Sequence, residues 1–235
     1  MTGDMASRAW LVRLIAPALV AGLCACASGP PPPDWQVNAR LAIDDAVSAH
    51  LLGEHNRETG SFERARRELA RTGRPDLLAR AELMRCAAQV ASLAFGPCEG
   101  FERLRDEAAA PELAYADYLG AGVLPRPAIE RLPAVQRDIA TAVAGGRVSL
   151  TGVQGIADPL SRLIALAVLF QAGQASPELI ALAVDTASAQ GWRRPLLAWL
   201  GVQAELARRA DDTQAASRLQ RRIELIQGPP PAEPR

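Results

Sequence analysis

The stretch DPLSRLIALAVLFQAGQASPELIALAVDTASAQ, residues 158–190, decides the fold of this chain. Asp158 stands before Pro159, and Ser176 stands before Pro177. Each pair is typical of a helix start. Asp and Ser cap helices, and proline suits the first turn because N–H groups there have no partner within the helix. We expect one helix that ends near residue 172 and a partner that ends near residue 190.

This pattern recurs 36 positions later, where Pro195 corresponds to Pro159 and Asp212 corresponds to Ser176. We expect a helix from Arg194 to about residue 210 and a second helix that runs to Ile226. Paired helices with a period of this size indicate a helical array. The candidate repeat pairs are therefore residues 158–190 and 194–226.

The second pair contains Trp199, Val202, Leu206, Ala215 and Leu219. Their spacing resembles the large and small packing positions of tetratricopeptide-like repeats, although the glycine–tyrosine part of that motif is missing and the spacing is slightly long. The resemblance is limited to the C-terminal third and implies stacked helical hairpins. The alternative is an irregular helical bundle that contains two similar hairpins.

The remainder of the chain is also predicted to be helical, because alanine and leucine dominate and aromatic residues make up only 4%. The fold class is therefore all-α, with stacked helical hairpins in a tetratricopeptide-like or irregular α-α superhelix or bundle. We expect a single helical domain over residues 34–227 and a disordered, proline-rich tail over 228–235. The earlier helices are predicted at residues 34–52, 61–71, 75–94, 99–109, 111–119 and 133–144.

The N-terminal segment has the order of charge, apolar run and small residues that is typical of an export signal. Arg8 and Arg13 precede the apolar residues 14–23, a run far shorter than the roughly 20 residues that span a bilayer. The run ends in Leu23-Cys24-Ala25-Cys26, which resembles the lipobox of bacterial lipoproteins. The alternative is a simple secretory signal with a free Cys26.

The lipoprotein resemblance implies a signal peptide over residues 1–25 and acylation of Cys26, which becomes the first mature residue. Ala27 follows, and in the best-known lipoprotein families a residue other than Asp at that position resembles an outer-membrane address. Residues 26–33 include four consecutive prolines and are predicted to form an extended tether.

Once the signal is removed and Cys26 is acylated, Cys86 and Cys98 remain. An exported protein meets an oxidising compartment in which disulfides persist. If the preceding helix ends near Ser92, the chain can fold back and bring the two cysteines within the required Cα separation of about 4.4–6.8 Å. If that helix runs a turn further, two separate thiols remain.

The sequence offers no catalytic, cofactor-binding or metal-ligating set. His50 and His55 are five residues apart, so on a helix they point roughly 140° away from each other, and Gly53 lies between them. Ser149 and Thr151 lack a partnering histidine. A formal net charge of +0 argues against a dedicated nucleic-acid binder.

Two arginine-rich runs cover residues 64–74 and 208–222, and both are interspersed with carboxylates. Ion pairing on solvated helix faces explains much of this pattern. The alternative is contact with anionic lipid head groups or with an acidic partner.

The lipoprotein-like signal and the helical fold together predict a lipid-anchored protein of the outer membrane that faces the periplasm. By analogy with helical-repeat lipoproteins, we expect a non-enzymatic scaffold or assembly factor that binds an envelope protein. Its contacts are expected on the concave side and in the glycine-rich stretch 145–157, which otherwise reads as a connector. The alternatives are a cell-wall-acting enzyme with paired acids in a cleft, and a lipid or small-ligand carrier with a large apolar cavity.

Overall fold

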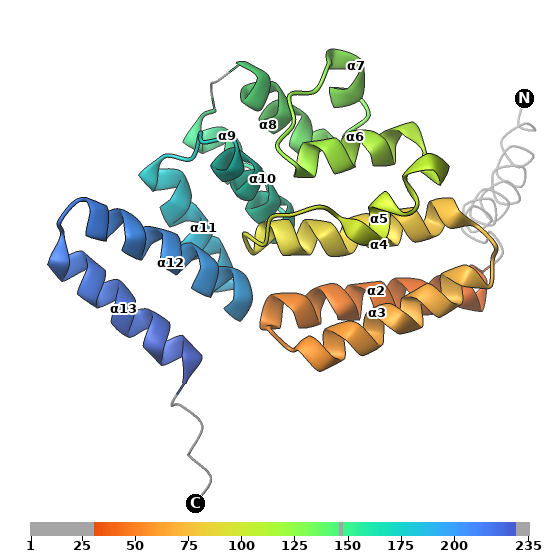
Figure 1. The fold of residues 1–235 in the computed structure, drawn as a ribbon, viewed down its shortest axis with the longest axis horizontal. Coiled ribbons are helices and arrows are strands. Elements are labelled where there is room, and N and C mark those ends of the chain that lie inside the picture. Colours follow the sequence, from red (N-terminus) through yellow and green to blue (C-terminus); the bar gives the residue numbers. More distant parts are fainter. Residues whose placement is uncertain (1–30, 146–147, 229–235) are drawn as a thin grey trace, which may run out of the picture.

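The computed structural model describes residues 31–145 and 148–228, and in these ranges the chain is built of helices with no strand (Figure 1). The helices pack against one another, as the predicted all-α fold class requires. Their bounds are α2 (Asp34–Leu52), α3 (His55–Ala70), α4 (Pro75–Ala91), α5 (Glu99–Glu102), the 3₁₀ turn η2 (Arg105–Glu107), α6 (Ala110–Leu119), α7 (Arg126–Ile129), α8 (Ala134–Gly145), α9 (Leu150–Gln154), α10 (Pro159–Gln171), α11 (Pro177–Ala189), α12 (Arg193–Arg209) and α13 (Thr213–Gln227).

Side-chain caps fix the starts of three of the last four helices. Asp158 accepts a hydrogen bond from the Ser161 N–H at the start of α10, Ser176 does the same at α11, and Asp212 caps α13. These bonds satisfy N–H groups that have no partner within the helix. α12 is the exception: it begins at Arg193, one residue before the predicted start, so Pro195 occupies its third position.

The predicted repeat pairs correspond to α10–α11 and α12–α13, and these four helices pack in sequence order. Burial decreases along the array. Leu163 and its equivalent Trp199 are both fully buried, whereas Phe170 is half-buried and its equivalent Leu206 is exposed. The α12–α13 pair ends the described stack, so no further hairpin covers its outer side.

α4 and α10 form the centre of the molecule. α4 packs against α2, α3, α5, α6 and α10, while α10 also contacts α6, α8, α9 and α11. Figure 1 shows the α2–α3 hairpin beside α4, with α12 and α13 toward the opposite end of the long axis. α12 also contacts α2, so helices far apart in the sequence bring the two parts of the chain together.

Two hydrophobic cores result from this arrangement. The main core runs from α4 to α12 and includes Phe101, Leu166 and Trp199. A smaller core lies between α2, α3 and α4 around Ile43 and Phe62. The α2–α3 hairpin therefore packs on α4 through an apolar cluster that is separate from the main core.

Several predicted helix bounds are corrected by the structure. α3 begins at His55 and not at Ser61, because the chain is already helical at Glu58, which points inward toward His50. The predicted helix 99–109 is instead α5 followed by η2, with the break at Leu104. The stretch 145–157 contains α9, whose start is capped by Ser149, and α7 is a short helix in a segment where the sequence predicts none.

α4 ends at Ala91 and not at residue 94, so the chain turns back early. Leu93 adopts a positive φ of 58° in this turn, a backbone conformation uncommon for a residue with a side chain. The turn returns Cys98 to α4, and the structure pairs it with Cys86 at a Cα separation of 5.8 Å.

The predicted signal and Cys26 lie outside the described residues, as does most of the predicted tail. Pro33 directly before α2 has φ −63° and ψ 149°, a polyproline II backbone conformation. Within residues 31–145 and 148–228, no helix is both long and apolar enough to cross a membrane.

Candidate functional site

An open groove of about 650 Å³ lies beside the disulfide. The turn after α4, helices α5 and α6, the loop after α6 and helix α7 form its walls, and it combines apolar and charged side chains. Its lining includes Val90, Phe95, Cys98, Glu102, Arg105, Leu113, Asp117, Val123, Leu124, Arg131 and Gln171. We call this cavity the groove.

Two large apolar side chains of the groove are unusually accessible. Phe95 is 38% exposed and Val123 is 73% exposed, and they come from the turn after α4 and the loop after α6. The ring of Phe95 is held in place by stacking on Phe170 at 6.3 Å. The groove therefore presents an aromatic and an aliphatic side chain that are available for contact with another molecule.

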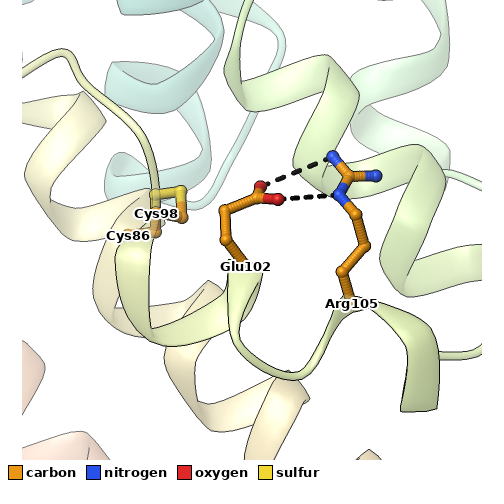
Figure 2. Close-up of a disulfide and its surroundings, with 4 residues drawn as sticks. All are labelled: Cys86, Cys98, Glu102 and Arg105. Atoms are coloured by element: carbon orange, nitrogen blue, oxygen red, sulfur yellow. Dashed lines mark hydrogen bonds and ion pairs between the residues drawn. A yellow bond between two sulfur atoms is a disulfide. The ribbon is translucent and has the colours of Figure 1, made fainter.

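Three charged side chains of the groove form a connected group of ion pairs. Arg105 donates hydrogen bonds to Glu102 at 2.8 Å and to Asp117 at 3.1 Å. These hydrogen bonds, first with Glu102, raise the pKa of Arg105 above its ordinary value. Figure 2 shows Glu102 between the disulfide and Arg105.

The two carboxylates of the groove share this one guanidinium, so each is already an ion-pair partner. Glu102 and Arg105 are three residues apart, a spacing that often indicates pairing, but nothing in the sequence placed Asp117 beside them. Arg131 lies at the edge of the groove and has no ion pair among the described side chains.

The disulfide fixes the turn that forms part of the groove. Cys86 is buried in α4, while Cys98 borders the groove and precedes α5. Because the bond links α4 to the residue just after the turn 92–97, it limits how far Phe95 can move relative to α4.

A second notable cluster is buried between α2, α3, α4 and α12. His50 Nδ1 lies 3.0 Å from Glu58 Oε1 and 3.1 Å from Arg194 Nη1, and Arg85 approaches Glu58 at 3.9 Å. Burial, more than any other cause, lowers the pKa of His50. His55 is exposed on the first turn of α3 and does not join this cluster.

The tyrosines at positions 115 and 118 belong to the packing of α6. Tyr118 donates a hydrogen bond to Gln136 at 2.5 Å, and Gln136 in turn donates to the carbonyl of Ser161 at 3.0 Å. Burial raises the pKa of Tyr115 to about 12. Tyr118 therefore connects α6 with α8 and α10 through Gln136, and Tyr115 stacks on Tyr118.

The remaining sequence candidates are not brought to the groove. Ser149 and Thr151 border a different cavity of about 440 Å³ near α8 and α9. Within the described ranges, no group of three or more His, Cys, Asp or Glu side chains is placed to hold a metal ion. No protein-family model, curated protein sequence or solved structure matches this chain.

Proposed function

We propose that this chain is a lipid-anchored envelope protein that faces the periplasm and binds a segment of another envelope protein in the groove, without catalysing a reaction. The observation that carries this proposal is the groove itself, which is open to solvent and presents exposed Phe95 and Val123. Exposed aromatic and aliphatic groups in a concave surface are characteristic of protein-binding sites.

The cellular localisation in this proposal comes from the sequence. The residues that end in Cys26 resemble a lipobox, and the Cys86–Cys98 pair suits an oxidising compartment. The polyproline II conformation at Pro33 suits a spacer between an anchor and α2.

The shape and charge of the groove favour a protein partner over the two alternatives. A carrier of apolar ligands is expected to enclose its cargo, whereas this cavity is open and carries Glu102, Arg105 and Asp117. A cell-wall hydrolase needs one carboxyl group as an acid and one as a base or nucleophile, whereas both groove carboxylates are committed to Arg105.

The test places a photo-crosslinking amino acid at Val123 in living cells. The matched control carries the same group at Val135, which is exposed on α8 and lies outside the groove. We expect position 123, and not position 135, to crosslink one discrete envelope protein. The purified partner should bind the wild-type chain and the Val135→Asp variant, and should lose binding to Val123→Asp.

Two results contradict the proposal. One is a protein that shows no fatty acid at Cys26 by mass spectrometry and is released from membranes. The other is hydrolysis of cell-wall fragments that stops in the Glu102→Gln variant, which assigns the groove to an enzyme.

A further inference from the structure

The outer side of α13 carries a cluster of positive charge. Arg218, Arg221, Arg222 and Leu225 follow the spacing i, i+3, i+4 and i+7, so they share one face of the helix. All four are exposed, and Leu225 is 82% exposed. We call these four residues the arginine face.

The other side of α13 is already occupied. Leu219, Ile223 and Ile226 pack against the main core, and α12 is the helix beneath them. The arginine face therefore points away from the molecule, and burial of the apolar side of α13 does not explain it.

Ion pairing within the protein does not explain the face either. Arg208 and Arg209 on neighbouring α12 both bind Glu205, each at 2.8 Å. In contrast, Arg218, Arg221 and Arg222 form no ion pair with any carboxylate of the described ranges. Glu224 is the one acidic residue in α13, and it accepts a hydrogen bond from Gln220.

We propose that the arginine face binds the anionic surface of a lipid bilayer. Guanidinium groups form paired hydrogen bonds with phosphate, and an exposed leucine among them can insert at the boundary between head groups and acyl chains. The face is convex and has one protruding apolar side chain. A fluid bilayer can accommodate such a side chain without a complementary pocket. A folded protein partner would need a pocket that fits it.

The geometry of the fold gives this contact a consequence. The start of α2 and helix α13 lie toward opposite ends of the long axis (Figure 1). If the N-terminal lipid and α13 both contact one bilayer, the long axis of the protein lies parallel to the membrane surface. This orientation depends on the proposed lipid anchor, whereas the binding of α13 to anionic lipid does not.

The test uses residues 26–235 with Cys26→Ser, which contain both cores and the disulfide, and circular dichroism verifies their helices. This protein is sedimented with vesicles of phosphatidylcholine alone or mixed with phosphatidylglycerol. We expect binding to the mixed vesicles only, and its loss at high salt. An arginine near an anionic surface contributes about fivefold to binding, so Arg218→Gln with Arg221→Gln should weaken it about 25-fold.

The matched control is Arg208→Gln with Arg209→Gln, which removes the same charge from arginines that are already paired. It should bind within about twofold of the parent, since those guanidinium groups are engaged by Glu205. Arg218→Lys with Arg221→Lys should retain most of the binding, and Leu225→Asn should weaken it at constant charge.

Three outcomes overturn the inference: no binding to phosphatidylglycerol vesicles, equal binding to neutral vesicles, or equal losses in the two arginine-to-glutamine variants. If vesicles fail to bind but α13 crosslinks an acidic envelope protein, the face belongs to a protein partner. The crosslink at Val123 tests the proposed function separately, because the arginine and leucine variants of α13 do not change Val123.

Discussion

The carboxylate of Glu82 on α4 occupies the space in which a side chain at Gly100 on α5 would begin. Glu82 is almost completely buried, and Arg66 on α3 donates a hydrogen bond to it at 2.5 Å. The bare backbone of Gly100 on α5 therefore leaves room for an ion pair that joins α3 and α4 beside the disulfide.

A methyl group at position 100 should disturb this ion pair. In Gly100→Ala the new Cβ overlaps the Glu82 carboxylate, which must move away from Arg66 within a buried site. Breaking a buried ion pair leaves charges without compensation, and we expect a loss of about 1–3 kcal/mol in the free energy of unfolding. Urea denaturation followed by circular dichroism measures this loss.

The matched control is Gly201→Ala in α12, where a Cβ meets no atom within 4 Å. Alanine is the better helix former by roughly 0.5–1 kcal/mol, so this variant should be neutral or more stable. In a Glu82→Ala background the cost of Gly100→Ala should largely disappear. An undiminished cost there would show that Glu82 is not the cause.

Removal of the disulfide should destabilise the whole chain. Cys86 and Cys98 are separated by 12 residues, and closing a loop of this length contributes about 3 kcal/mol in the chain-entropy model. We expect Cys86→Ala with Cys98→Ala to lower the free energy of unfolding by about 2–3 kcal/mol. Dithiothreitol should lower the stability of the wild type and leave that of the double variant unchanged; equal responses would contradict the pairing.

The helices of the fold could be predicted from the sequence, because the residues that start and stop a helix lie close together in the chain. α2 has the predicted bounds Asp34–Leu52, with Gly53 at φ 82° after it. The 36-residue repeat correctly aligned buried Leu163 with buried Trp199. Capping residues and periodic apolar positions lie within a few residues of one another, so one sequence is sufficient to find them.

The candidate site could not be predicted in the same way, because its residues come together through tertiary packing. The groove depends on the break at Leu104, which divides a predicted helix and precedes the 3₁₀ turn that begins at Arg105. His50 and Arg194 are 144 residues apart in the sequence, and no local pattern connects them. The described residues 148–156 of the predicted contact stretch line a different cavity, the one near α8 and α9.

Trp199 provides a testable connection between the repeat region and α4. Its indole N–H donates a hydrogen bond at 3.2 Å to the carbonyl of Ala91, in the last turn of α4, where carbonyls lack partners within the helix. We expect Trp199→Phe to cost about 1–3 kcal/mol, since it removes a buried hydrogen bond and side-chain volume. Trp192→Phe, at a half-buried tryptophan, should cost less by the same urea assay; a larger cost there would contradict this role of Trp199.

The buried His50 should make stability depend on pH in a defined direction. Burial lowers the pKa of folded His50 below its ordinary 6.5; Glu58 raises it in part, and the positive charges of Arg194 and Arg85 lower it further. Below about pH 6.5 the unfolded chain therefore binds a proton that the folded chain does not. Stability from this group is complete above pH 6.5 and is lost as the pH falls through the lowered pKa.

Glu82 acts in the opposite sense, because burial raises its pKa above the ordinary 4.5. The folded chain binds the extra proton here, so the stability linked to Glu82 is present below pH 4.5 and is lost as the pH rises through the raised pKa. We expect His50→Gln to flatten the fall in stability below pH 6.5 and Glu82→Gln to make that fall steeper. His55→Gln, which removes an exposed imidazole, should keep the wild-type slope. Urea midpoints at several pH values test this, and a His50→Gln variant that follows the wild-type slope contradicts the assignment even if it is less stable at every pH.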